Sequence, residues 1–434
     1  MSTLLPTSAA GTYPDVHKIV RETLQKEIRT VDHIAKDGVT VTHDLTLDDG
    51  AQVVLRTSAP TMSPLVLDSE IATLKYLADQ TSVPVPKVLA FASEKHELGS
   101  FSLIEKPSGV PLDTLFFDLP ATEQNSLVAR IAGWMLESSR HNFNAVGSVF
   151  VGEGGIQAGP MIRRSFFLDG RAKLALDRGP FTSARAYYSA CAQRELDCCR
   201  ALFVQDASPT YQRDLNDARL RVERIVGLMY DLISQCPGLD DDDPEMAPFT
   251  VDIHHLGLKN ILVSPESPST VTAVVDWRFT NILPFWCCAR LPTWLSQSLS
   301  RNSEDRERLS AVFRAAISRV DGEDSKFLRS VDSEGTRHAL DDLADYDAFK
   351  DGFLLLPALE NILATIPGHE DIAGLSALLD PKTLPGRVAR INLLTRGSNA
   401  MFLAMSPPRS PARALEVDGS DRVQTPTEQA VAVN

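Results

Sequence analysis

The sequence predicts an α+β fold with two lobes, a small one rich in strands and a larger one that is mainly helical. Three short runs rich in β-branched residues lie between residues 30 and 57, as expected for a small sheet. From residue 120 onward, apolar residues recur mostly at the spacing of amphipathic helices. Residues 249–277 interrupt these helices with two more strand-like runs, and polar residues there carry the prediction of function.

The small lobe is predicted to occupy residues 14–107, after a segment (residues 1–13) that is rich in Ser, Thr, Gly and Pro and is expected to be disordered. Asp48-Asp49-Gly50 marks a tight turn between two strands. The expected elements are a helix over residues 14–29 and strands over residues 30–35, 39–47 and 53–57.

Two charged residues of the small lobe are candidates for a binding site. Arg56 lies near the end of the third strand, and Ser69-Glu70 opens a helical run that continues over residues 71–77. A guanidinium group can hold a phosphate or a carboxylate through two parallel hydrogen bonds. A simpler explanation remains open for each residue. Arg56 would then be a surface arginine of a strand, and Glu70 an acid that the helix dipole favours near the helix N-terminus.

The large lobe is predicted over residues 108–405. Trp134 lies on the apolar stripe of one expected helix and is assigned to the core. The acidic run Asp240–Asp243 is expected to be a solvated loop, and residues 406–434 a disordered tail. Helices are expected over residues 120–140 and 209–236, and then in a helical section over 284–299, 304–320, 337–366 and 372–379.

Residues 249–277 predict a β-hairpin. Two β-branched runs flank a turn rich in Ser and Pro, residues 264–269, with Asn260 at one end and Asp276 at the other. Because a hairpin brings its ends together, an amide oxygen and a carboxylate would meet there. Such oxygen ligands suit Mg²⁺.

This stretch resembles the aminoglycoside phosphotransferase / choline kinase-like family, especially its large fungal branch. That branch usually has His-x-Asp-Leu-x-x-x-Asn-Ile-Leu-Val followed by Ile-Asp-Trp, and this chain has Asn260-Ile-Leu-Val and Val275-Asp276-Trp277. Residues 69–112 also resemble the family pattern. The resemblance implies a bilobal protein-kinase-like fold and an ATP- and Mg²⁺-dependent transfer of the γ-phosphate to a small-molecule hydroxyl.

The resemblance also implies roles for single residues. Arg56 would hold phosphates and Glu70 would orient it, as the corresponding pair does in kinases. Glu105 stands where the family's strand leads into the hinge that binds adenine, so it is assigned to the nucleotide site. Asn260 and Asp276 would bind Mg²⁺. The glycine-rich phosphate loop is represented only by Gly38.

Two positions depart from the family pattern. His255 stands where the family has its catalytic Asp, and Ile253 stands where the family has a His that braces the loop. Three hypotheses follow. In the first, His255 acts as the base, since neutral imidazole is competent near pH 7. In the second, the protein is a pseudokinase or scaffold, and in the third the fold serves other acid/base chemistry through His254 and His255. On an extended chain these two side chains are expected to point to opposite faces.

Composition excludes several classes of protein. The 434-residue chain has a formal net charge of −14 and no basic stripe, so no nucleic-acid partner is expected. It has no run of 18 apolar residues and no signal peptide, so a cytoplasmic location without a membrane partner is predicted. The six cysteines lack zinc-like spacing and are expected to be reduced, buried thiols.

Overall fold

The computed structural model describes residues 14–36, 40–58, 62–93, 100–202, 209–240, 243–296, 303–333 and 335–368. The chain divides into two compact units, Met1–Val204 with Met229–Asp347, and Gln205–Leu228 with Ala348–Asn434. The segments predicted to be disordered (residues 1–13 and 406–434), the helix expected over residues 372–379 and Gly38 all lie outside the described residues.

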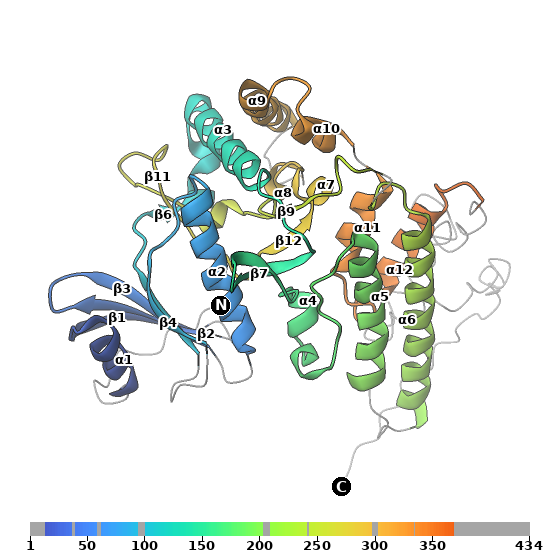
Figure 1. Ribbon diagram of the computed structural model, residues 1–434, viewed down its shortest axis with the longest axis horizontal. Helices are drawn as coiled ribbons and strands as arrows, with labels where there is room; N and C mark the ends of the chain where they lie inside the picture. Colours follow the sequence, from blue (N-terminus) through green and yellow to red (C-terminus); the bar gives the residue numbers. More distant parts are fainter. Residues whose placement is uncertain are drawn as a thin grey trace, which may run out of the picture. The chain divides into compact units, whose positions relative to one another are not determined.

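A five-stranded antiparallel sheet of order β1-β2-β3-β5-β4 forms the small lobe (Figure 1). The three strands predicted between residues 30 and 57 are confirmed. Gly50 adopts a φ of +83° in the predicted turn, a left-handed conformation that glycine adopts at little cost. The strands are β1 (Ile28–Lys36), β2 (Thr40–Leu47), β3 (Gln52–Ser58), β4 (Val88–Ala92) and β5 (Phe101–Glu105).

Helix α1 (Pro14–Leu24) packs on this sheet and is shorter than predicted. The prediction extended it to Arg29, but Gln25 has a φ of +56°, which ends the helix and lets β1 begin at Ile28. Apolar residues of α1 at helical spacing bury one face against the sheet. The cluster contains Val16, Ile19, Val20, Leu45, Leu47, Val53, Leu55, Phe101 and Leu103.

Helix α2 (Pro64–Gln80) connects β3 to β4 and carries Glu70. The prediction began this helix at Ser69, but Pro64 starts it one turn earlier, where the fixed φ of proline suits a first helical position. Ten side chains of α2 are buried, and Glu70 is one of them. The helix therefore holds Glu70 rigidly beside β3.

The predicted hairpin is confirmed as β10 (Ile261–Val263) and β11 (Val271–Val274), which pair antiparallel. β6 (Val110–Pro111) completes a three-stranded sheet of order β11-β10-β6. The first residues of the stretch belong elsewhere, because β9 (Phe249–Val251) pairs with β12 (Asn281–Pro284). β7 (Gly147–Gly152) and β8 (Gly155–Gly159) extend that second sheet. Residues 252–260 thus form a loop that links two sheets.

Several helices agree with the prediction. Trp134 is buried in α3 (Ala121–Ser138), as expected. α6 (Pro209–Gln235) and α9 (Ser303–Asp321) also match. The further helices are α4 (Arg164–Phe167), α5 (Ala184–Leu202), α7 (Phe285–Cys288), α8 (Thr293–Ser296), α10 (Lys326–Asp332), α11 (Thr336–Ala344) and α12 (Gly352–Leu363).

Two helical predictions were too long. Residues 337–366 form α11 and α12 with a break between them, where Asp345, Asp347 and Asp351 precede Gly352, and these residue types favour turns over helix interiors. In the predicted section 284–299, the described residues 284–296 form the short helices α7 and α8, and Pro292 lies between them.

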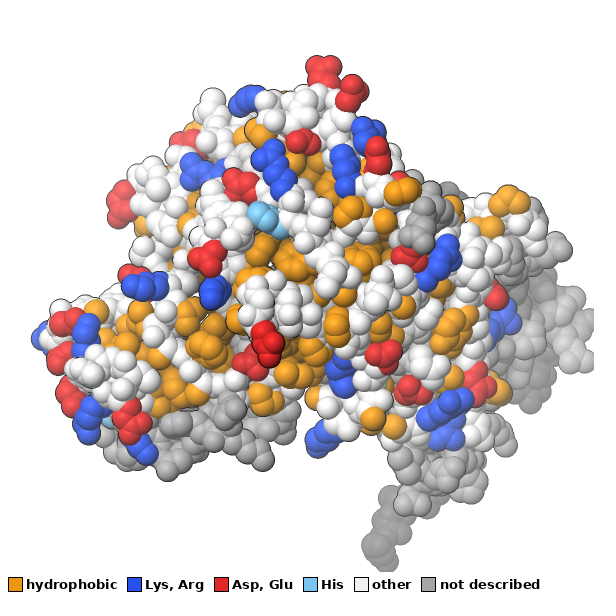
Figure 2. Space-filling model, in the orientation of Figure 1, with side chains coloured by type: hydrophobic (Ala, Val, Ile, Leu, Met, Phe, Trp, Pro, Cys, Tyr) orange, Lys and Arg blue, Asp and Glu red, His pale blue; other side chains and the backbone are white. Residues whose placement is uncertain are grey.

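Three further observations concern the described helices, the surface charges and the cysteines. None of the described helices is long and apolar enough to cross a membrane. On the face drawn in Figure 2, the coloured acidic and basic side chains are interspersed and form no continuous basic patch. All six cysteines are free and buried, as the sequence predicts.

The two described residues of the acidic run, Asp240 and Asp243, lie in a loop as predicted, but they are only partly solvated and their carboxylates contact other segments. Asp240 is half-buried, and its carboxylate accepts the backbone N–H groups of Ala184 at 2.6 Å and Arg185 at 3.2 Å, at the start of α5. Asp243 accepts from Arg337 at 2.8 Å. Backbone donors in the first turn of a helix have no partner within the helix, so a distant carboxylate can cap them.

Replacement of Asp240 by Ala is expected to lower the free energy of unfolding by about 0.5–2 kcal/mol, because two backbone donors of α5 lose their acceptor. Denaturant unfolding measures this change. Asp231→Ala is the matched control, since Asp231 is exposed in the body of α6. Equal destabilisation by the two substitutions would contradict the capping role.

Candidate active site

The loop between β9 and β10 is held by Asp252 and His254. The Asp252 carboxylate accepts the backbone N–H of His254 at 3.0 Å and contacts its ring Nδ1 at 2.6 Å, so Nδ1 carries the hydrogen. Burial acts to raise the pKa of Asp252, but His254 outweighs it and holds that pKa well below its usual range. The loop is therefore braced, although Ile253, at the position of the family's bracing His, is a buried apolar residue.

His255 is exposed to solvent, whereas His254 is buried. The expectation that their side chains diverge was wrong: the ring centroids lie 3.8 Å apart. The reason is a turn, in which the Leu256 N–H donates to the Ile253 carbonyl at 3.0 Å, so the backbone is not extended here. The pKa of His255 is lowered to about 4. The main cause is desolvation of the ring by neighbouring protein atoms, which disfavours the charged form, and the electrostatic interaction with His254 acts in the same direction.

Asn260 and Asp276 flank the hairpin, as predicted. The Val275 N–H donates to the Asn260 carbonyl at 2.9 Å, which ties the two ends together. Asp276 adopts a φ of +65°, a left-handed conformation that costs energy for most residues but is more accessible to Asp and Asn. Its carboxylate, 39% exposed, lies 3.2 Å from Nε of Arg278.

One groove collects these residues. It encloses about 1080 Å³, including space open to solvent. His255, Asn260 and Asp276, which lie apart in the sequence, all line it. The other lining residues are Arg163, Arg164, Asp252, Ile253, Leu256, Gly257, Lys259, Trp277, Arg278, Phe279, Thr280, Asn281 and Asp345.

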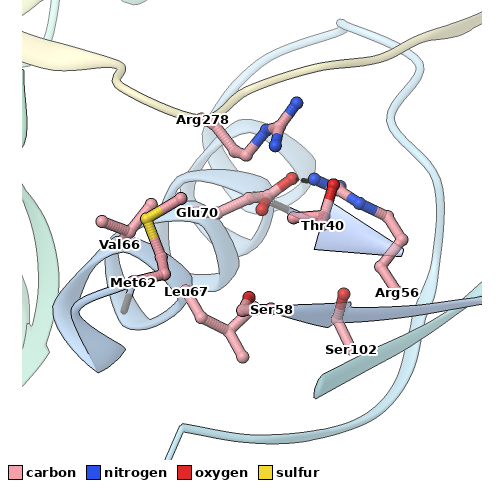
Figure 3. Close-up of a pocket in the computed structure, with 9 residues that line it drawn as sticks. All are labelled: Thr40, Arg56, Ser58, Met62, Val66, Leu67, Glu70, Ser102 and Arg278. Atoms are coloured by element: carbon pink, nitrogen blue, oxygen red, sulfur yellow. Dashed lines mark hydrogen bonds and ion pairs between the residues drawn. The ribbon is translucent and has the colours of Figure 1, made fainter. Parts of the chain in front are cut away.

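The predicted ion pair of the small lobe is present. Arg56 Nη1 lies 2.6 Å from Glu70 Oε1, and both side chains are largely shielded from solvent. Figure 3 shows this pair in a small pocket, with the guanidinium of Arg278 directed toward Glu70 from another segment. A second small pocket joins Arg56 and Glu70 to Asp276. The ion pair of Arg56 and Glu70 is thus adjacent to Asp276.

The chain has a bilobal, protein-kinase-like fold. It combines a five-stranded antiparallel sheet, a helix whose Glu70 pairs with the strand residue Arg56, and a larger lobe that presents Asn260 and Asp276 on one hairpin. This kinase-like arrangement was predicted from the sequence.

Glu105 differs from the other predicted site residues because it lines none of the pockets described above. It ends β5 with an exposed side chain, and its backbone N–H donates to the Lys87 carbonyl at 2.9 Å. The next amide, that of Lys106, donates to the Gln52 carbonyl at 3.1 Å. Because both amides are used within the small lobe, these two donors are not free for a ligand, and Glu105 lines none of the three pockets described above.

Asp252 and Arg278 are two of the groove residues that the sequence prediction missed. Asp252 lies two residues before His254, and this Asp-x-His spacing was a signal for a carboxylate that orients an imidazole. Arg278 lies two residues after Asp276, and a cation so close to a predicted metal ligand was a signal for a competing charge. Arg278 lines both the groove and the pocket of the ion pair.

No known family model matches the chain. Two curated relatives come from strains of Aspergillus fumigatus, and each is described as a subtelomeric hrmA-associated cluster protein. Each is 23% identical over 311 residues, a match that covers 62% of this chain and 61% of the relative. The chain thus spans less than two thirds of the length of the curated relatives it matches.

Three solved structures are among those similar to this chain. A thermostable mutant of aminoglycoside phosphotransferase APH(4)-Ia, in complex with AMP-PNP and hygromycin B, is 16% identical with a TM-score of 0.43, over 82% of this chain and 99% of that one. A putative fructosamine-3-kinase from Thermobifida fusca is 16% identical with a TM-score of 0.45, over 80% and 98%. A putative aminoglycoside phosphotransferase from Ralstonia eutropha is 15% identical with a TM-score of 0.43, over 90% and 94%. Likenesses this distant say nothing about the substrate.

Proposed function

We propose that this protein is an ATP- and Mg²⁺-dependent kinase of a small-molecule hydroxyl, with His255 at the position of the base. The observation that carries the proposal is the single groove lined by His255, Asn260 and Asp276. A base, an amide oxygen and a carboxylate in one open groove are the groups that phosphoryl transfer to a hydroxyl requires.

Asn260 and Asp276 fit a hard cation, because the hairpin brings an amide oxygen and an accessible carboxylate to one groove. When bound there, Mg²⁺ would neutralise charge on the phosphates. Arg56, oriented by Glu70, would hold phosphate oxygens. Arg278 competes for the Asp276 carboxylate and has to yield it in part when the metal binds.

In the proposed reaction, the hydroxyl oxygen of the acceptor forms a bond to the γ-phosphorus, and the bond from that phosphorus to the leaving ADP oxygen breaks. The hydroxyl proton passes to the imidazole of His255. Because the pKa of His255 is lowered to about 4, the ring is neutral near pH 7 and free to accept this proton. The braced loop keeps the ring in position through Asp252 and His254.

A pseudokinase is the second candidate, and one observation favours it. The guanidinium of Arg278 already partners Asp276, so a protein cation can take the place of the metal. Such a protein would bind nucleotide without Mg²⁺ and transfer no phosphate.

Calorimetric titration with ATP tests the two candidates, performed with Mg²⁺ and with a chelator at millimolar nucleotide. The kinase is expected to bind ATP much more tightly with Mg²⁺ and to release ADP when hydroxyl compounds are added. Binding that is indifferent to the chelator, without ADP release, would favour the pseudokinase. Absence of binding under both conditions would contradict both candidates and leave a scaffold that binds no nucleotide.

A further inference from the structure

We infer that the acceptor is a hydroxyl compound carrying a carboxylate or a phosphate, and that it is not an amino sugar. The inference rests on the proposed function, since it names the class of small molecule that shares the groove with the nucleotide. The observation behind it is the pairing of the charged side chains that line the groove.

The carboxylates of the groove are already paired within the protein. Asp252 accepts from His254, as described above. Asp345 is used at both oxygens, since Arg163 Nε lies 2.9 Å from one and the Ser165 hydroxyl donates to the other at 2.8 Å. Asp276 pairs with Arg278. An ammonium group on a ligand would therefore have to break an existing ion pair or hydrogen bond, at an energetic cost.

Two cations of the groove are free to meet a ligand. Arg164 and Lys259 are both exposed, and across the ranges that the structure describes neither side chain lies within salt-bridge distance of a carboxylate. The guanidinium of Arg164 lies over the Phe279 ring, 5.1 Å from its centroid. This contact occupies one face of the guanidinium and leaves its N–H donors at the edge available for an anion.

These free cations matter because the whole chain carries a formal net charge of −14. A negative protein repels anions at long range, so an anionic ligand needs a local positive field to bind. Arg164 and Lys259 supply that field in the groove that holds His255. The charge presented to a ligand there is positive, which favours carboxylates and phosphates and disfavours the several ammonium groups of an aminoglycoside.

Calorimetry on the full chain tests the inference, with and without saturating ADP and Mg²⁺. The probes are gluconate and glucose 6-phosphate as anions, glucose as the uncharged reference and kanamycin as the polycation. At least one anion is expected to bind, more weakly as salt increases, while glucose and kanamycin do not. The two anions separate a carboxylate site from a phosphate site.

Arg164→Gln and Lys259→Gln are each expected to weaken binding of the anionic probe by about 10-fold, the effect of losing one charge-assisted hydrogen bond. Arg319→Gln is the matched control, because Arg319 is an exposed cation on α9 outside the lining of the groove. It should leave anion binding unchanged. Melting temperatures of all variants show whether they are folded.

Kanamycin binding in preference to the anions, or no anion binding at all, would overturn the inference. So would anion binding that disappears when ADP is bound, because the two cations would then belong to the nucleotide. Anion binding without any nucleotide binding would support the anion site and contradict the kinase proposal. Failure of the inference and failure of the proposed function are thus separate results.

Discussion

Replacement of His255 by Ala is expected to lower turnover by about 10²-fold or more while nucleotide binding is largely retained. The imidazole would be lost from the position that receives the acceptor proton, whereas Asn260 and Asp276 would still line the groove. Single-turnover assays and calorimetry measure the two quantities separately. His33→Ala, which removes an exposed histidine of β1, is the matched control.

The pH dependence of kcat/KM provides a second test of the role of His255. A base works only when deprotonated, so its contribution increases as the pH rises through its pKa. Because the pKa of His255 is lowered to about 4, this contribution should already be complete above pH 6, and kcat/KM should show no inflection near 6.5 from His255. Turnover that is unaffected by His255→Ala would end the base hypothesis.

His255→Asp restores the residue type of the family pattern and distinguishes a working site from a degenerate one. Because Asp252 and His254 already brace the loop, Asp at position 255 does not depend on a new bracing histidine at Ile253. A wild-type protein without turnover and a His255→Asp variant with turnover would identify a pseudokinase that had lost its base. The double change Ile253→His with His255→Asp then tests whether the family's own brace adds anything.

Asp276→Asn is expected to weaken Mg²⁺-dependent ATP binding by about 10²-fold and to leave the melting temperature nearly unchanged. Loss of the carboxylate removes the charged ligand of the proposed metal site. Asn also tolerates the left-handed backbone at this position, where φ is +65°, so the substitution adds little strain. The carboxylate is 39% exposed, and its loss should disturb the fold little.

The controls for Asp276 separate the metal from the neighbouring cation. Asp113→Asn changes an exposed carboxylate in the short helix Leu112–Thr114 and should leave ATP binding unaltered. Arg278→Gln frees Asp276 and should increase the dependence of ATP binding on Mg²⁺ if the two cations compete. Unchanged metal-dependent binding in Asp276→Asn, at an unchanged melting temperature, would refute the metal role.

The class of fold and most of the candidate residues that line the groove and the adjacent ion pair could be predicted from the sequence alone. Local patterns were sufficient for the strands of the small lobe and for the hairpin between Asn260 and Asp276, because strand alternation and turn chemistry act over a few residues. The ion pair of Arg56 with Glu70 was predicted from the resemblance to kinase-like proteins. The departure at His255 was also visible, since it is a change of residue type within a short motif. Helix ends were less accurate, as Gln25 and Pro292 show, because a single backbone dihedral or proline decides them.

Which charges are paired could not be predicted from the sequence and is visible only in the folded chain. Asp345 and Arg163 lie far apart in the sequence, and no local pattern predicts that they form an ion pair in the groove. The same holds for Asp240 at the start of α5, and for Arg278 beside the pocket of Arg56 and Glu70. Charge pairing depends on distances of a few ångströms between segments that the fold brings together. The sequence therefore identified candidate charged residues, but the packing of the chain determined which of them remain free to bind a ligand.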